Sequence, residues 1–148
     1  MDNSDPVHDP FRPVKATPTV VRVAVPTPLP TCFDYLPGRA GSLHPGVRVR
    51  VPFGRGHSVG IVVATGVPSS VGAARLKSVE AALDERPVFD TPLLELLGWA
   101  ADYYCHAPGE VMAAALPRLL RTGRPVDALE TVWTLTEAGQ RTVRNQRD

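Results

Sequence analysis

The triplet Phe33-Asp34-Tyr35 places one carboxylate between two aromatic side chains. Asp34 is also the only acidic residue between positions 20 and 77, a segment that holds seven basic residues. A carboxylate in this setting can accept a hydrogen bond from a ligand hydroxyl or base, while an aromatic ring supplies a stacking surface. The alternative is that Phe33 and Tyr35 are core side chains and Asp34 caps a turn. The triplet alone leaves both interpretations open.

Basic and acidic residues are separated along the 148-residue chain, although its formal net charge is only +1. Residues 20–77 have a net charge of +6, and residues 78–117 have a net charge of −6. A basic surface on the first segment would suit a phosphate-bearing partner such as nucleic acid. The alternative is that both segments are solvated faces of one dipolar domain.

Arginines alternate with valines over residues 46–52 (GVRVRVP). Because side chains of a strand point alternately to its two faces, the pattern predicts buried valines, with Arg48 and Arg50 on the exposed face. Arg55 follows in the glycine-flanked turn 54–56. We therefore expect Arg48, Arg50 and Arg55 to contact a DNA backbone if the partner is DNA.

The elements that would position these residues are short strands followed by helices. An N-cap at Asp90 or Thr91, Pro92 and a periodic apolar face predict a helix reaching Tyr104. Residues 76–83 fit a strand or a helical turn, and we favour the strand. Further elements are expected as strands over 19–25, 32–36, 46–52 and 57–64, the last two as a hairpin, and as a second helix over 108–116.

The ends of the chain are predicted to lie outside this unit. Residues 1–18 are proline-rich without periodicity and are expected to be a disordered extension. Residues 118–124 are expected to form a basic connector, followed by a strand over 130–135 and a helix over 136–144 that cannot close a core of their own. The predicted fold is α+β: a small, mostly antiparallel, β-barrel-like domain with two packed helices.

Patterns for other chemistry are missing from the sequence. It has no Gly-Lys-Ser/Thr phosphate loop and no CxxC pair, so we expect neither nucleotide hydrolysis nor a bound metal or cofactor. Cys105 and His106 could be a nucleophile and its base, but adjacent residues rarely present both side chains to one site. We therefore interpret them as structural. Neither a signal peptide nor an apolar run of membrane-spanning length is evident, which predicts a cytoplasmic protein with reduced thiols.

Several longer strings resemble the N-terminal part of the bacterial primosomal protein N′ (PriA) family of replication-restart helicases. They cover about residues 20–125, and the combination of PLPxxFDY, RVRVPFG and WAADYY is specific. The strings are VRVAVPTPLPTCFDYLPG (21–38), PGVRVRVPFGRGHSVGIVV (45–63), LKSVEAALDERPVF (76–89), LLGWAADYYCHAPGEVMAAALP (96–117) and LLRTGRP (119–125).

The resemblance implies a 3′-DNA-binding domain over residues 19–117 and an incomplete winged-helix segment over 118–148. In that family the domain captures the 3′ end of the nascent leading strand at a stalled or abandoned fork. The motor motifs of the family are absent from this chain, so no enzymatic activity is expected of it. The terminal nucleotide would lie near Phe33, Asp34, Tyr35, Gly54 and Lys77.

Partners implied by the resemblance are replication-fork DNA and, further, other primosome proteins and single-stranded-DNA-binding protein in a cytoplasmic, nucleoid-associated setting. A different class of function remains open: a protein-interaction β module whose basic face meets an acidic protein. A steep salt dependence of binding to fork-like DNA would favour the first class, because each phosphate contact releases counterions.

Overall fold

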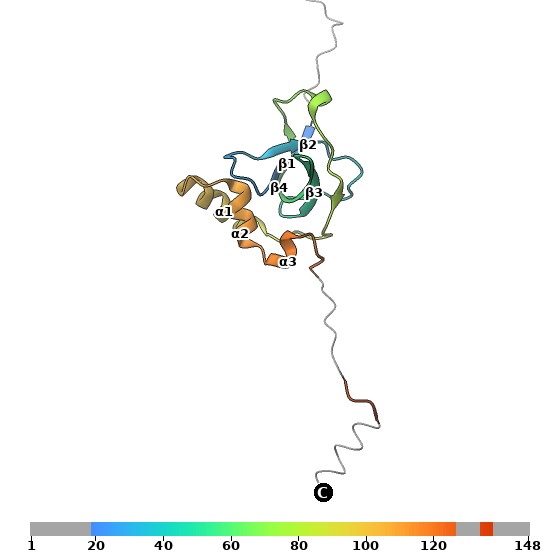
Figure 1. Ribbon diagram of the computed structural model, residues 1–148. Coiled ribbons are helices and arrows are strands. Elements are labelled where there is room, and N and C mark those ends of the chain that lie inside the picture. Colours follow the sequence, from blue (N-terminus) through green and yellow to red (C-terminus); the bar gives the residue numbers. More distant parts are fainter. Residues whose placement is uncertain (1–18, 127–133, 138–148) are drawn as a thin grey trace, which may run out of the picture.

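A five-stranded antiparallel sheet and three helices make up the computed structural model, which describes residues 19–126 and 134–137 (Figure 1). The α+β class is therefore confirmed. In chain order the elements are β1 (Thr19–Ala24), β2 (Phe33–Tyr35), β3 (Arg48–Phe53), β4 (Gly56–Pro68), the 3-10 turn η1 (Ala73–Arg75), β5 (Ala81–Ala82), α1 (Thr91–Tyr103), α2 (Pro108–Ala115) and α3 (Arg118–Arg121).

The strand order β2-β1-β4-β3-β5 places the long β4 at the centre of the sheet. The two halves of β4 pair with β1 and β3. The β1–β4 pairing has two register shifts, at Val20/Val21 and at Arg22/Val23, and at each of them β4 has one extra residue. Such bulges bend a strand and increase its twist, which lets a small sheet curl. The predicted hairpin of β3 and β4 is confirmed, with Phe53 opposite Gly56 across its turn.

The two edges of the curled sheet come together beside Leu36. Leu36, just after β2, donates its N–H to the carbonyl of Lys77 and accepts a bond from the N–H of Val79, both at 2.9 Å. These bonds form one isolated parallel bridge, between Leu36 and Ser78. The sheet is thus barrel-like but not a closed barrel, and the segment leading into β5 lies beside the end of β2.

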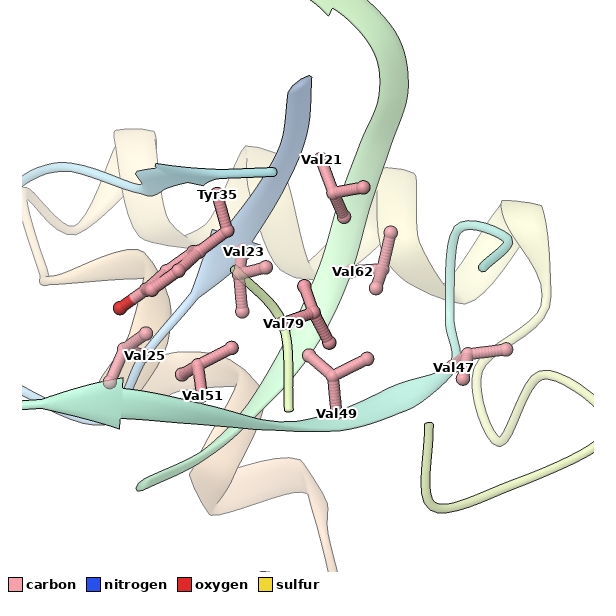
Figure 2. Close-up of a cluster of buried hydrophobic side chains, with 9 residues drawn as sticks. All are labelled: Val21, Val23, Val25, Tyr35, Val47, Val49, Val51, Val62 and Val79. Carbon is pink, nitrogen blue, oxygen red and sulfur yellow. The ribbon is translucent and has the colours of Figure 1, made fainter. Parts of the chain in front are cut away.

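Valines fill the interior of the curled sheet (Figure 2). The prediction that the valines of residues 46–52 point into the core is confirmed, since Val47, Val49 and Val51 are fully buried. Tyr35 is the one large ring in this buried cluster and is 4% exposed. The cluster as a whole comprises Val21, Val23, Val25, Tyr35, Val47, Val49, Val51, Val62 and Val79.

Both predicted helices are present, and they lie together beside the sheet (Figure 1). Asp90 caps α1 by accepting a hydrogen bond from the N–H of Leu93 at 3.0 Å, as its position before Pro92 predicted. Met112 of α2 and Leu116, which follows the helix, pack with Phe89 in a second buried cluster on the outer face of the sheet. This cluster fixes the helices to the strands.

Gly109 allows α2 to approach β1 closely. A Cβ atom built at this position would lie 1.8 Å from the carbonyl oxygen of Val25, a backbone atom that cannot rotate away. Gly109→Ala should therefore lower the free energy of unfolding by about 1–3 kcal/mol, the range typical of overpacking. Urea denaturation provides the measurement.

Gly98→Ala is the matched control for that substitution. Gly98 lies in α1, and a Cβ atom added there would meet no other described atom within 4 Å. Alanine is favoured over glycine inside a helix by roughly 0.5–1 kcal/mol, so this variant should be slightly more stable. Equal stability changes in the two variants would show that the close approach of α2 to Val25 is unimportant.

One prediction for the segment after α2 is wrong. Residues 118–124 were expected to form only a basic connector, but Arg118–Arg121 is the short helix α3, and Arg48 of β3 donates to the carbonyls of Leu120 and Arg124. The predicted N-terminal extension 1–18 lies outside the described residues, as do most of the predicted strand 130–135 and helix 136–144. Among the helices of the described ranges, none has the length and hydropathy that crossing a membrane requires.

Candidate functional site

A cavity of about 740 Å³ opens at the β2 edge of the sheet. All five residues that the resemblance placed at a nucleotide line it: Phe33, Asp34, Tyr35, Gly54 and Lys77. They come from β2, from the β3–β4 turn and from the segment before β5, so folding brings together positions 33 and 77. The cavity is large enough for a nucleotide-sized ligand.

Asp34 is held by an arginine of the neighbouring strand. Arg22 and Asp34 are directly opposite in the β1–β2 pairing, and Arg22 Nε donates to Asp34 Oδ1 at 2.9 Å. A second bond joins Arg22 Nη2 to Asp34 Oδ2 at 3.4 Å. The hydrogen bond from Arg22 lowers the pKa of Asp34 and raises that of Arg22, so both groups are charged at neutral pH.

The carboxylate of Asp34 retains acceptor capacity, since each oxygen has two lone pairs and the arginine uses one on each. Its side chain is 11% exposed, against 40% for Arg22. The pair therefore presents a fixed, negatively charged acceptor beside a partly exposed cation. This orientation of Asp34 differs from the turn cap that the sequence left as an alternative.

The two aromatic residues of the triplet have different environments. The Tyr35 ring is in the core and its hydroxyl donates to the carbonyl of Pro52 at 3.2 Å, so it can form only the floor of the cavity. Phe33 is half-buried and meets Phe53 edge to face, with ring centroids 5.1 Å apart. Phe33 and Phe53 thus offer the apolar wall against which a base could pack.

Gly54 begins the β3–β4 turn with a φ of 59°, a conformation that disfavours residues with a Cβ. No described atom lies within 4 Å of the position a Cβ would take, so its backbone faces open space at the cavity. Arg55 is exposed next to it and makes no ion pair within the described ranges. The turn therefore combines an accessible backbone with an available cation.

Lys77 and Arg75, from the segment before β5, supply positive charge to the lining of the cavity. Both are exposed, and neither is engaged in a salt bridge in the described part of the chain. With Arg22 and Asp34 included, the side chains of the lining have a net charge of +2. The combination of an apolar wall, one oriented carboxylate and two available cations matches the parts of a nucleotide: base, hydroxyl and phosphate.

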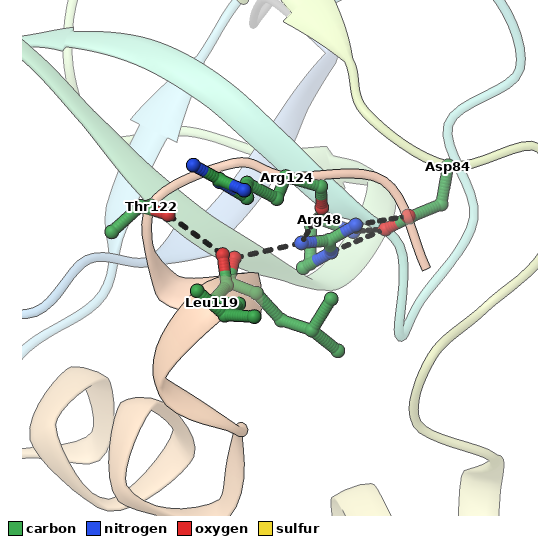
Figure 3. A network of polar contacts seen from close by, with 6 residues as sticks. Arg48, Asp84, Leu119, Thr122 and Arg124 are labelled. Atoms are coloured by element: carbon green, nitrogen blue, oxygen red, sulfur yellow. Dashed lines mark hydrogen bonds and ion pairs between the residues drawn. The ribbon is translucent and has the colours of Figure 1, made fainter. Parts of the chain in front are cut away.

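The expectation that Arg48 is exposed is wrong. Its side chain is 0% exposed and binds Asp84 through two bonds, Nε to Oδ2 at 2.8 Å and Nη2 to Oδ1 at 2.5 Å. Its Nη1 donates to the carbonyls of Leu120 and Arg124 at 2.7 and 2.9 Å, as Figure 3 illustrates for this network. Arg48 does point away from the valine interior, but Asp84 and the turn after α3 cover that face. It therefore cannot reach a DNA phosphate.

Arg50, two residues further on the same face, is exposed as predicted. The alternation in sequence identified correctly which side chains leave the valine interior. It could not show that a helix 70 residues later in the chain would cover one of them.

Cys105 and His106 lie at the end of α1, and His106 faces Glu110 at 3.5 Å. Cys105 is exposed with a φ of 50°, in the left-handed turn that terminates the helix. Across the residues that the structure describes, no three His, Cys, Asp or Glu side chains are grouped to hold a metal ion. The second thiol, Cys32, is on the wall of the cavity, and burial raises its pKa.

Sequence reasoning missed Arg22, Phe53 and Arg75 as cavity residues. Phe53 stands next to Gly54, so its place could have been inferred from the turn. The position of Arg22 depends on the register between β1 and β2, and that of Arg75 on the path of the 68–76 loop. Neither has a local sequence signal.

Comparison with known proteins gives concordant matches. The family model described as the 3′DNA-binding domain (3′BD) of PriA matches residues 22–117. A curated relative from Haemophilus influenzae, the replication restart protein PriA, is 41% identical over 122 residues, or 82% of this chain. The protein of the same name from Buchnera aphidicola subsp. Acyrthosiphon pisum is 25% identical over 122 residues. The chain spans 17% of the length of both relatives.

Proposed function

The chain belongs to the family of PriA 3′DNA-binding domains, and from this membership we propose that its β2-edge cavity binds the 3′-terminal nucleotide of a DNA strand during replication restart. The single observation that carries the proposal is the cavity itself. It gathers, from three separate segments, an apolar wall, an oriented carboxylate and two cations. The function is one of binding, and we propose no catalytic step for this chain.

Each part of the terminal nucleotide has a counterpart in the cavity. The base packs against Phe33 and Phe53, because a stacking surface accepts any base. Asp34 accepts a hydrogen bond from the 3′-hydroxyl or from a base amino group. Lys77 and Arg75 attract the phosphate on the 5′ side of that nucleotide.

Recognition of this kind reads an end rather than a sequence. Among the described residues, the lining holds no asparagine or glutamine, the side chains that most often bind adenine through two hydrogen bonds. Gly54 supports the interpretation, since its exposed backbone permits a sugar to approach closely. A factor that restarts replication at any fork needs a site that binds DNA ends of every sequence.

The proposed setting follows from the relatives, whose names describe replication restart proteins. We propose fork DNA as the partner, with other primosome proteins and single-stranded-DNA-binding protein as further partners of the complete protein in the bacterial cytoplasm. The second candidate function, a protein-interaction module with a basic face, gains some support from the exposed Arg50 and Arg55. It leaves the lining of the cavity unexplained.

A comparison of linear and circular DNA tests end recognition. A linear single-stranded oligonucleotide should bind about tenfold more tightly than the same sequence circularised, since only a free end can enter the cavity and stacking of one base is worth about 1–3 kcal/mol. Fluorescence anisotropy at ~100 mM salt measures both affinities. Changing the 5′ end from hydroxyl to phosphate is the control and should alter little.

Salt titration in the same experiment separates the two candidate functions. For a DNA-binding domain, the logarithm of the association constant should fall steeply with the logarithm of the salt concentration. Equal binding of linear and circular DNA would refute end recognition. Absence of any measurable DNA binding, together with capture of an acidic protein, would favour the protein-interaction module.

A further inference from the structure

A second cavity, of about 510 Å³, lies on the outer face of the β3–β4 hairpin. Its lining is basic and hydroxyl-bearing, with one apolar side chain among six: Arg50, His57, Ser58, Val59, Arg121 and Thr122. Within the described chain, no aromatic ring other than the imidazole lines it, so it lacks the surface on which a base would stack. Its chemistry suits a phosphate group.

Arg50 is available for an anion. Its exposed guanidinium makes no hydrogen bond or ion pair within the described residues, although it lies beside the turn after α3. A Cβ atom built at Gly123 would be 3.5 Å from Arg50 Nη2, which locates the guanidinium at that turn. Five N–H donors thus remain to be satisfied by water or a ligand.

Arg121 is available and also fixed in position. Its Nε donates to the carbonyl of Leu116 at 2.9 Å, and its Nη2 donates to the carbonyl of Ala114 at 3.2 Å. These bonds hold the guanidinium at the end of α2 and leave the N–H groups of Nη1 free. A guanidinium that is already oriented loses less conformational entropy when it binds a phosphate.

Two acidic residues near this cavity, Glu80 and Asp84, contact side chains other than Arg50 and Arg121. Among the described residues, the only ion pair of a lining side chain joins His57 Nδ1 to Glu80 Oε1 at 3.5 Å. Asp84, on the segment that follows β5, is bound to the buried Arg48. Arg50 and Arg121 therefore keep their positive charge available to a ligand.

The second cavity is adjacent to the first along the hairpin. Arg50 and Pro52 point to the same face of β3, and Pro52 lines the β2-edge cavity while Arg50 lines the second one. Two residues of a strand span about 7 Å, roughly the rise of two stacked nucleotides. His57, which lines the second cavity, is directly opposite Pro52, which lines the first.

We propose that this second cavity binds a backbone phosphate of the DNA strand whose 3′-terminal nucleotide occupies the first, a few nucleotides from the end. The inference rests on the proposed end recognition and extends it to a path for the strand. Arg121 lies beyond residues 22–117, so the site adds to the segment that the family model matches. Arg48 holds the turn that carries Arg121 by donating to the carbonyls of Leu120 and Arg124, and Figure 3 draws this polar network.

Ligand length provides the test. The full chain should bind a single-stranded hexanucleotide with a 3′-hydroxyl more tightly than a dinucleotide, because only the longer ligand reaches the second cavity. Arg50→Ala and Arg121→Ala should each weaken hexanucleotide binding about fivefold to tenfold and reduce the salt slope by ~0.7, the value for one phosphate contact of a single strand. Dinucleotide affinity should not change.

Arg118→Ala is the matched control. Arg118 is exposed on the same short helix but lines neither cavity, so the salt slope should stay at the value of the unmodified chain. Arg121→Ala removes two bonds to α2 and could loosen α3, whereas Arg50→Ala removes none. The Arg50 variant therefore decides the outcome if the Arg121 variant unfolds.

Two results would overturn the proposal. One is an unchanged salt slope in the Arg50 variant. The other is an equal loss of dinucleotide affinity, which would assign the arginine to the terminal nucleotide. The slope comparison repeated on circular DNA tests this cavity even if end recognition fails.

Discussion

Arg48→Ala should lower the free energy of unfolding by about 3–5 kcal/mol, the range observed when one partner of a buried ion pair is removed. The side chain is 0% exposed and Asp84 is 6% exposed, so the substitution leaves a carboxylate buried without its partner. It also removes the donors to the carbonyls of Leu120 and Arg124. Because the total free energy of unfolding of such a domain is only about 5–15 kcal/mol, the variant should be close to unfolding at 37 °C.

Equilibrium denaturation in urea measures the effect, and Arg50→Ala provides the control on the same face of β3. Arg50 is exposed and unpaired in the described chain, so its loss should change stability by less than ~0.5 kcal/mol. Replacing both members of the buried pair, as Arg48→Met with Asp84→Leu, should recover much of the loss because no charge then remains uncompensated. Similar small effects of Arg48→Ala and Arg50→Ala would contradict the buried network.

Because Arg48 is buried and Arg50 is exposed, a loss of DNA binding has a different meaning for a substitution at each of them. If Arg48→Ala abolished DNA binding, the cause would be unfolding of the domain and loss of the turn after α3, because Arg48 itself contacts no phosphate. Arg50 and Arg55 are the residues of this face whose substitution reports on the surface itself. Stability has to be measured beside affinity for each arginine variant.

Sequence patterns predicted the elements well because their causes are local. Valine alternation over 46–52 needs only the two-residue period of a strand, and the start of α1 needs only Asp90 and Pro92. The short α3 was missed because four residues with two arginines have little helical signal of their own. Its bonds to Arg48 stabilise it, and those come from a strand 70 residues earlier.

The candidate site could be predicted only in part, for a similar reason. Its residues were named through resemblance, and the structure brings all five to one cavity. The roles of the FDY triplet follow from pairing register instead. Alternation along β2 directs Tyr35 into the valine core, and the opposition of positions 22 and 34 gives Asp34 its arginine. A sequence does not state which residues of two strands will be opposite.

A 3′-hydroxyl end should bind about tenfold to a hundredfold more tightly than the same DNA with a 3′-phosphate. The hydroxyl can donate to the Asp34 carboxylate, and a hydrogen bond to a charged group is worth roughly 1.5–3 kcal/mol. A terminal phosphate has no such donor at neutral pH and brings negative charge toward a carboxylate that Arg22 keeps ionised by lowering its pKa. Anisotropy with a recessed end of each type, at ~100 mM salt, gives the ratio.

Asp34→Asn separates the carboxylate from the rest of the cavity, since the amide keeps the size of the side chain and retains an acceptor. The variant should bind hydroxyl ends less tightly and phosphate ends more tightly, because the charge of Arg22 would no longer be neutralised by a carboxylate and could attract the phosphate. The preference should then fall toward unity. Lys77→Ala should instead weaken both ends by similar factors, because its proposed ligand is the phosphate that both share. Equal affinity of the unmodified chain for the two ends would mean that the Arg22–Asp34 pair only joins β1 to β2, and that the end is held by the aromatic wall and the cations alone.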